Sequence, residues 1–206
     1  METLDRKKHW ENIYETKQLD EVSWYQPNPT TSLYFIKQFS VPLTAKIIDI
    51  GGGDSFFVDY LLQLGYTDIT VLDISENAVK RAKIRLGHKA TAVKWIVADA
   101  ASFQPTEKYD FWHDRAAFHF LTDEKEIANY IKTAQQNINS NGVLIVGTFS
   151  EQGPKKCSGI EIKQYSETSL TDVFGKYFEK SDSFSINHKT PFDTIQNFVF
   201  CSFRKK

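Results

Sequence analysis

A short β-branched run that ends in three consecutive glycines constrains this chain more than any other feature. Residues 46–50 read Lys-Ile-Ile-Asp-Ile, and the glycines at 51–53 follow directly. Such a run is typical of a strand buried in a parallel sheet. A helix is expected next, with Asp54 as its N-cap and Gly65 at its end. Strand, glycine turn and helix together predict an α/β fold with a nucleotide-like ligand at the turn.

The alternation of strand and helix continues along the chain. Ser75 is expected to cap the next helix, and another helix is predicted over residues 123–139. Strand and helix at this spacing indicate a doubly wound parallel sheet. The last two strands have no helix between them, so a reversed, antiparallel strand is expected at the edge of the sheet. The predicted fold is α/β, a mostly parallel seven-stranded Rossmann-like sheet, with strands at 46–50, 69–73, 93–97, 109–112, 143–146, 177–187 and 195–203.

The chain divides into an N-terminal segment, residues 1–44, and a sheet domain, residues 45–206. Helical spacing in the N-terminal segment predicts one helix over 5–18 and another over 32–39. Prolines between them exclude a continuous helix, because proline removes a backbone donor and restricts the residue before it.

Acidic residues stand at the ends of the first three predicted strands: Asp49, Asp73 and Asp99. The carboxyl ends of parallel strands meet at one edge of a sheet, where ligands bind. Asp73 can accept from two ribose hydroxyls, Asp99 beside Ala100 can accept from an adenine amino group, and Asp49 can attract an ammonium group. A dinucleotide loop needs a small residue where this chain has Phe56, which disfavours NAD and FAD. S-adenosylmethionine has no phosphate to bind and does not need that residue.

In order and spacing, these motifs resemble the class I S-adenosylmethionine-dependent methyltransferases over residues 45–203. The matching residues are Asp49-x-Gly51-x-Gly53, Asp73 and Asp99-Ala100, followed by the antiparallel end strand. The resemblance implies S-adenosylmethionine as cofactor and contacts to it at Gly51, Gly53, Asp73 and Asp99. The predicted cofactor site also includes their neighbours Asp49, Gly52, Ile74 and Ala100.

The aromatic residues of the N-terminal segment extend the resemblance. His9-Trp10-x-x-x-Tyr14 and Ser23-Trp24-Tyr25 resemble the entry segment of a subgroup with protein-lysine methyltransferases and bacterial enzymes of unassigned substrate. Aromatic rings attract a sulfonium and exclude water. Trp10, Tyr14 and Tyr25 are therefore predicted cofactor contacts in a lid, with ordinary core packing as the alternative.

The catalytic candidates are His113, Asp114 and Arg115, because in this fold the end of the fourth strand lies beside the transferring methyl. His113 is a candidate general base, and Arg115 is a candidate partner for the cofactor carboxylate or for a substrate acid. His119 has apolar neighbours and is expected in the core. The lysine enzymes carry Asp-Lys-Gly where this chain has Asp114-Arg115-Ala116, so the acceptor stays open: a protein lysine or a small molecule, at nitrogen or oxygen.

Composition limits the other function classes. The net charge is −1 without a long basic block, so nucleic acid is not an expected partner. Two cysteines and no metal-binding cluster predict a reducing, cytoplasmic setting and no metal. Residues 1–10 lack the apolar run of a signal peptide, and no apolar stretch long enough to span a membrane is found. An NAD-dependent oxidoreductase and a cofactor-binding protein without turnover are the alternatives; no feature indicates an oligomeric state.

Overall fold

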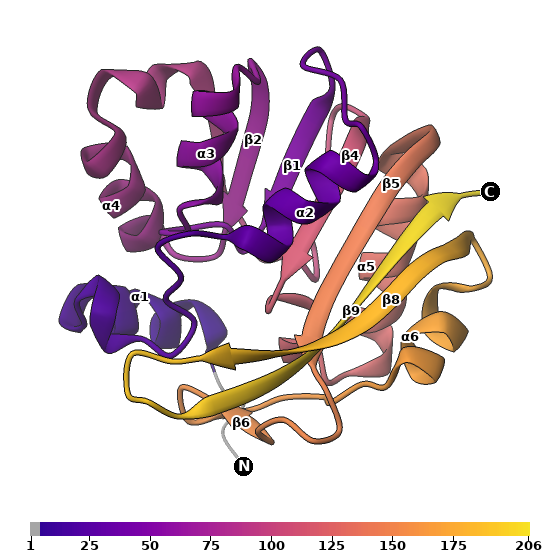
Figure 1. Cartoon of the computed structure of the whole chain (residues 1–206). Coiled ribbons are helices and arrows are strands. Elements are labelled where there is room, and N and C mark those ends of the chain that lie inside the picture. The colour runs from indigo at the N-terminus through magenta and orange to yellow at the C-terminus, as the bar shows by residue number, and fades with distance from the viewer. Residues whose placement is uncertain (1–4) are drawn as a thin grey trace.

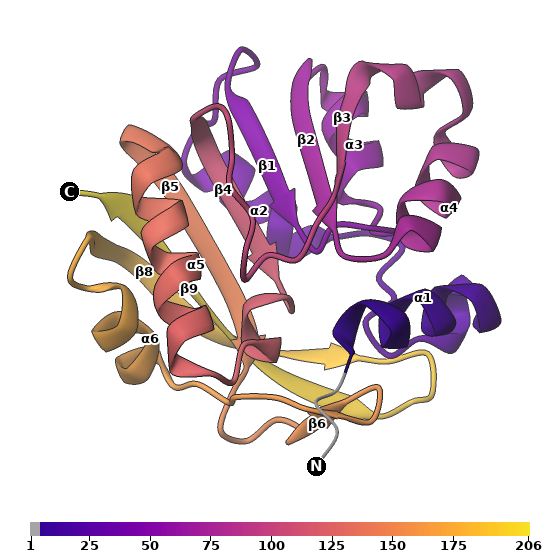
Figure 2. The ribbon, with the colours of Figure 1, turned by 180° about the vertical axis from the view of Figure 1, so that it is seen from behind.

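The computed structural model describes residues 5–206 and contains one seven-stranded sheet with the order β3-β2-β1-β4-β5-β9-β8 (Figures 1 and 2). Strands β1 to β5 are mutually parallel, and β9 is antiparallel to both of its neighbours. The predicted fold class is therefore confirmed. The strands are β1 Lys46–Ile50, β2 Asp68–Asp73, β3 Val93–Val97, β4 Tyr109–Arg115, β5 Ile138–Phe149, β8 Phe178–Lys189 and β9 Ile195–Lys205.

The sequence predicted the reversed strand at the edge of the sheet. In the structure this strand, β9, lies one position further in, between β5 and the edge strand β8. The two strands differ in polarity: residues 198–203 of β9 are all buried, whereas most of β8 is exposed or half-buried. An apolar strand is stabilised by neighbours on both sides, and a polar one tolerates an open edge. This difference explains why β9 takes the inner position.

Helices cover both faces of the sheet. The helices α2 and α3 pack on one face, and α5 and α6 on the other (Figures 1 and 2). A short hairpin of β6 Lys156–Cys157 and β7 Ile160–Glu161 follows β5. The α-helices are α1 Arg6–Thr16, α2 Thr30–Gln38, α3 Phe57–Leu64, α4 Glu76–Leu86, α5 Glu124–Asn137 and α6 Glu167–Phe174; the 3-10 helices are η1 Leu19–Glu21, η2 Gly87–Ala92 and η3 Phe118–Phe120.

Most helix ends follow the sequence signals. The Ser75 side chain accepts from the Ala78 N–H at the start of α4, and Gly65 ends α3 in a left-handed conformation. The expected cap at Asp54 is wrong: α3 begins at Phe57, and the Asp54 carboxylate instead pairs with two arginines of α4. Helix α6 was not expected from the sequence.

The N-terminal segment is not one unit. Helix α2 belongs to a sheet layer, because Phe35 and Ile36 join the core beneath it. Helix α1 lies across the carboxyl ends of the parallel strands (Figure 1), where Trp10, Ile13 and Val22 form a small separate cluster with Ile160. Residues 1–4, part of the predicted segment and of the signal-peptide expectation, lie outside the described residues. Within residues 5–206, no helix is long and apolar enough to cross a bilayer.

Candidate functional site

A pocket lies at the carboxyl ends of β1, β2 and β4, beneath α1 and beside β9. Twelve of the predicted site residues line it: Trp10, Tyr14, Tyr25, Asp49, Gly51, Gly52, Asp73, Ile74, Asp99, Ala100, His113 and Arg115. The fold therefore brings together residues that are up to about one hundred positions apart in the chain, as the strand-end pattern predicted.

Two of the three glycines of the turn, Gly51 and Gly52, line the pocket, and each is required for a different reason. Gly51 has φ +65°, and a Cβ there would lie 2.7 Å from the Cβ of Ala117, so only glycine fits without strain. A side chain at Gly52 would overlap the Asp49 carboxylate. The turn thus presents bare backbone to the pocket.

The sequence predicted a cofactor contact at Gly53, but this residue is not among those that line the pocket. A side chain there would overlap the Asp73 carboxylate and lie 2.9 Å from the Cβ of Ala78 in α4. The absence of a side chain at Gly53 therefore lets Asp73 and α4 pack close to the turn.

Asp49 and His113 form a buried pair on neighbouring strands. The His113 Nδ1 lies 2.7 Å from Asp49 Oδ1, and both side chains are at most 4% exposed. An ionised carboxylate only accepts hydrogen bonds, so the histidine donates from Nδ1, and in the neutral ring Nε2 then carries the lone pair. The Nε2 atom is buried and has no partner within residues 5–206. His113 thus offers an unused proton acceptor in a residue that lines the pocket.

Asp73 is buried at the end of β2 and accepts a hydrogen bond from the Ser75 N–H at 2.8 Å. The pKa of this carboxyl is raised to about 7. Burial is the main cause and the charge of Asp49 adds to it, while the hydrogen bond from Ser75 lowers the pKa in part. Buried carboxyl groups with a shifted pKa are common at ligand sites, so Asp73 is a candidate ligand contact.

We expect Asp73→Asn to weaken binding of S-adenosylhomocysteine by roughly 1–3 kcal/mol, because the variant lacks a charged acceptor. The free energy of unfolding should instead increase in the variant at high pH. The pKa of Asp73 is above its ordinary value, so wild type loses stability as pH rises from about 4 to about 7. The variant has no such loss and should be the more stable protein at pH 8. Calorimetry and urea unfolding at pH 5 and 8 measure both effects; unchanged affinity in a folded variant would contradict the assignment.

Asp99 has a partner that the sequence did not indicate. Its Oδ2 accepts from the Arg6 guanidinium at 2.9 Å, and Arg6 also binds Glu126 through two hydrogen bonds of 2.7 Å. The Asp99 Oδ1 accepts from the Ala101 N–H. Arg6 therefore connects the start of α1 to the end of β3 and to α5, directly beside the predicted adenine contact.

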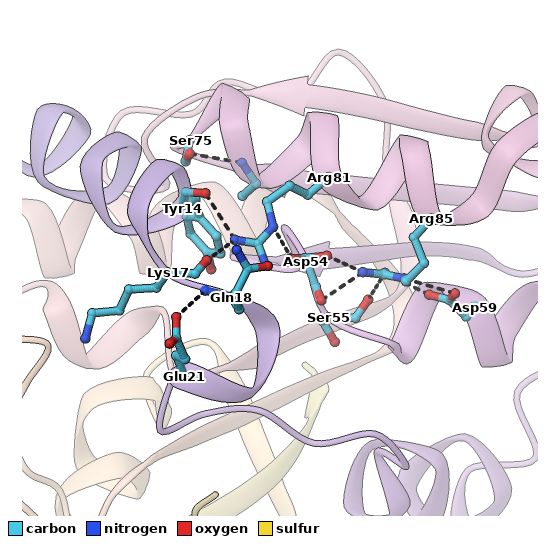
Figure 3. A network of polar contacts seen from close by, with 11 residues as sticks. Tyr14, Lys17, Gln18, Glu21, Asp54, Ser55, Asp59, Ser75, Arg81 and Arg85 are labelled. Carbon is cyan, nitrogen blue, oxygen red and sulfur yellow. Dashed lines mark hydrogen bonds and ion pairs between the residues drawn. The ribbon is translucent and has the colours of Figure 1, made fainter.

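Two further contacts attach α1 to α4. The Glu11 carboxylate accepts from the backbone N–H groups of Glu76 and Asn77 at the start of α4, where the helix dipole favours negative charge. At the other end of α1, Arg81 of α4 donates to the carbonyls of Tyr14 and Lys17, at 3.0 and 2.6 Å (Figure 3). These contacts hold the aromatic face of α1 over the pocket.

The arginines of α4 also bind the glycine turn. Arg81 pairs with Asp54 at 2.8 Å, and Arg85 pairs with Asp54 and with Asp59, the latter at 2.9 Å (Figure 3). The Arg85 guanidinium also lies 4.5 Å from the centre of the Phe56 ring and so orders the turn.

We expect deletion of residues 1–28 to leave a folded sheet domain with impaired turnover. Trp10, Ile13 and Val22 form a cluster separate from the two sheet cores, so the sheet keeps its own packing. Circular dichroism and size-exclusion chromatography check the fold, and a methyl-transfer assay checks turnover. Full activity would show that α1 is no lid, and an insoluble product would show that it belongs to the core.

Asp114 was predicted as a catalytic candidate, but its side chain does not line the pocket. Its side chain is fully buried and accepts from the Tyr130 hydroxyl at 2.6 Å and from the Ala117 and Phe118 N–H groups at 3.0 Å. Alternate residues of a strand point to opposite faces, so Asp114 points away from its neighbours His113 and Arg115. Asp114 orders the turn after β4 and is not a pocket residue.

His119 is a core residue, as its apolar neighbours indicated. It is fully buried, and its Nδ1 accepts from the Phe149 N–H at 3.2 Å. Burial lowers the pKa of this imidazole to about 3, so it is neutral at physiological pH.

The structure adds pocket residues that the sequence did not single out: Arg6, Gln26, Ser32, Arg81, Gln196 and Phe198. Gln196 and Phe198 enter from β9, whose place in the sheet depends on long-range pairing. Of these residues only Arg81 carried a local signal, since its spacing of four from Arg85 places both arginines on one helix face.

Comparison with known proteins agrees with this geometry. A family profile described as a methyltransferase domain matches residues 47–142. Malonyl-[acyl-carrier protein] O-methyltransferase 2 of Ilyobacter polytropus is 26% identical over 150 residues, 72% of this chain and 56% of that protein. EEF1A lysine methyltransferase 2 of Mus musculus is 26% identical over 85 residues, 37% of this chain and 35% of that protein. The chain thus spans about half the length, or less, of these curated relatives.

Solved structures share the fold over nearly the whole chain. A methyltransferase of Anabaena variabilis dependent on S-adenosylmethionine superposes with a TM-score of 0.78 at 12% identity, over 99% of this chain and 96% of that one. The N-methyltransferase NodS of Bradyrhizobium japonicum, in complex with S-adenosylhomocysteine, gives 0.73 at 16% identity, over 98% and 99%. The motifs at the strand ends, the methyltransferase-domain match over residues 47–142 and these relatives support a class I S-adenosylmethionine-dependent methyltransferase, and the solved structures share its fold.

Proposed function

We propose that this protein transfers the methyl group of S-adenosylmethionine to a nitrogen or oxygen nucleophile of an acceptor. The observation that supports it most strongly is the pocket itself. A bare glycine turn and carboxylates from three successive strand ends face one cavity beneath aromatic residues of α1. The curated relatives act, by their names, on a malonyl group on a carrier protein and on lysine of EEF1A, so both oxygen and nitrogen acceptors occur among them.

The residues of the pocket fit S-adenosylmethionine. Gly51 and Gly52 line the pocket without a side chain, and a Cβ at either position would clash with Ala117 or Asp49. Asp73 and Asp99 are proposed to accept from ribose and adenine, and Trp10, Tyr14 and Tyr25 to cover the cofactor. When bound, S-adenosylmethionine supplies an activated methyl group on a sulfonium, and the carbon–sulfur bond breaks as the acceptor lone pair bonds to carbon.

The chain's own contribution is alignment, exclusion of water and removal of one proton. Helix α1 is held over the pocket by Arg6, Glu11 and Arg81, which keeps water out. We propose His113 as the general base: Asp49 fixes its ring through Nδ1, and the unpartnered Nε2 takes the proton of the acceptor nucleophile.

Two alternatives are less favoured. A dinucleotide needs a small residue at position 56, but Phe56 is there, packed against Arg85 and 6.1 Å from the ring of Tyr25. A cofactor-binding protein without turnover would have no use for the buried Asp49–His113 pair, whose partners cost free energy to bury.

A transfer assay tests the proposal. The full chain is incubated with radiolabelled S-adenosylmethionine and a cell lysate, which is then separated into protein and small-molecule fractions. Enzyme-dependent label in either fraction supports methyl transfer. Binding of S-adenosylhomocysteine without transfer to any fraction would favour the binding protein.

The setting of the protein is also a proposal. Cys157 and Cys201 are buried free thiols, and burial raises the pKa of the Cys157 thiol to about 11. Unpaired thiols are typical of a reducing compartment, so we propose that the protein acts in the cytoplasm.

A further inference from the structure

The pocket has two sides of different charge. Its four carboxylates, Asp49, Asp54, Asp73 and Asp99, lie at the strand ends and the glycine turn that form the cofactor side. The other side, here called the acceptor side, is formed by β4, β9, the β6–β7 hairpin and the start of α2. Its side chains with polar or aromatic character include Gln26, Ser32, Arg115, Cys157, Gln196 and Phe198, and none of the described residues that line it is acidic.

Arg115 is the fixed positive charge of the acceptor side. Its guanidinium has five N–H donors, but within residues 5–206 it makes one hydrogen bond, to the Trp24 carbonyl at 3.3 Å, and no ion pair. Burial lowers the pKa of Arg115 to about 10, and the charge of Asp49 opposes that change, so the group is protonated at neutral pH. Asp49 itself is bound to His113. Arg115 is half-buried, so a ligand carboxylate that pairs with its unused donors would replace partial solvation rather than full hydration.

The direction of Arg115 separates it from the cofactor side. Strand β4 lies between β1, which leads into the glycine turn, and β5. The guanidinium lies 5.5 Å from the centre of the Phe198 ring on β9, which is beyond β5. Its carbonyl partner, Trp24, is in the loop before α2. The donors of Arg115 therefore face the acceptor side.

Other polar atoms of the acceptor side also lack partners. Ser32 Oγ, Gln26 Oε1 and Gln196 Oε1 are buried without a hydrogen bond among the described residues. Buried polar groups nearly always have a partner. The Ser32 hydroxyl can donate to a ligand, whereas the two glutamine oxygens can only accept, so the acceptor side can bind a ligand that carries hydrogen-bond donors as well as acceptors.

We propose that the methyl acceptor is a small organic acid whose carboxylate pairs with Arg115 on the acceptor side. This inference rests on the proposed function and selects one of its acceptor classes. The planar guanidinium matches a carboxylate with two parallel hydrogen bonds, and Phe198 and Trp24 provide apolar surface for the body of the acid. A lysine side chain would bring its ammonium next to a like charge, which disfavours it.

Benzoate and benzylammonium test the proposal, because they share a ring and differ in charge. Each is titrated by ligand-observed NMR into the full chain saturated with S-adenosylhomocysteine. We expect benzoate to bind about tenfold or more tighter than benzylammonium, as one charge-assisted hydrogen-bond pair implies. Equal binding, tighter binding of benzylammonium or no binding of benzoate would overturn the proposal. This comparison uses wild type and does not depend on how any variant folds.

Two matched variants locate the effect. Arg115→Gln should lose the preference for benzoate while its affinity for S-adenosylhomocysteine stays as in wild type. Arg204→Gln is the control, because Arg204 also lies over an aromatic ring, Phe39 at 5.2 Å, and donates to a carbonyl, but is exposed outside the pocket. A loss of S-adenosylhomocysteine affinity in Arg115→Gln equal to the loss of benzoate binding would assign Arg115 to the cofactor instead. Failure of wild type to bind S-adenosylhomocysteine at all would contradict the proposed function.

Discussion

His113→Ala is expected to lower kcat by about 10²–10⁴-fold while sparing the affinity for S-adenosylmethionine. The reason is the geometry of the buried pair: Asp49 accepts from Nδ1 at 2.7 Å, which leaves Nε2 without a partner within residues 5–206, in a residue that lines the pocket. The loss should shrink at high pH, where the acceptor nucleophile loses its proton unaided. The measurement is kcat from pH 6 to pH 10 for both proteins.

Controls separate catalysis from folding in this experiment. His113→Gln keeps a donor for Asp49 and removes the basic nitrogen, so it should lose as much activity with less change in stability. His88→Ala changes an exposed histidine of η2 and should behave as wild type. A His113→Ala enzyme with wild-type kcat across this pH range would rule out His113 as the base.

Gly51→Val is the second large expected effect: loss of measurable cofactor binding in a protein that still folds. A branched side chain at φ +65° is strained by roughly 1–2 kcal/mol, and its Cβ would lie 2.7 Å from that of Ala117. The remaining atoms of valine would then occupy the pocket side of the turn. Calorimetry with S-adenosylhomocysteine and thermal unfolding measure the two effects.

Gly87→Val is the matched control for the backbone strain. Gly87 has φ +57° at the end of α4, and no atom of residues 5–206 lies within 4 Å of a Cβ there. Both variants carry the backbone strain, and Gly51→Val adds the close contact with Ala117, so it should lose more stability; only Gly51→Val should lose the ligand. Native affinity in Gly51→Val would show that the turn does not contact the cofactor.

The sequence predicted those parts of the fold and site that depend on neighbouring residues. The run 46–50, the glycines after it and the cap at Ser75 are local signals, because strand, turn and helix start are determined within a few positions. Twelve predicted site residues line one pocket for a related reason. Each predicted strand ends at the same edge of a parallel sheet, so strand ends alone locate the ligand.

The missed features depend on contacts between distant residues. Asp54 satisfied the pattern of an N-cap, yet two arginines about thirty positions later bind its carboxylate. The inner position of β9 depends on its pairing with β5, a distant segment, although its sequence is more apolar than that of β8. Asp114 and Arg115 looked alike as site candidates, and the alternation of β4 sends one into the core and the other into the pocket.

Calorimetric titration of the full chain with S-adenosylhomocysteine, and separately with NAD⁺, tests the central claim most directly. It reports on the glycine turn, the strand-end carboxylates and the lid together, and it needs no knowledge of the acceptor. The account predicts saturable binding of S-adenosylhomocysteine that weakens in Asp73→Asn and disappears in Gly51→Val, with no binding of NAD⁺. Binding of NAD⁺ but not S-adenosylhomocysteine, or unchanged S-adenosylhomocysteine affinity in both variants, would contradict it.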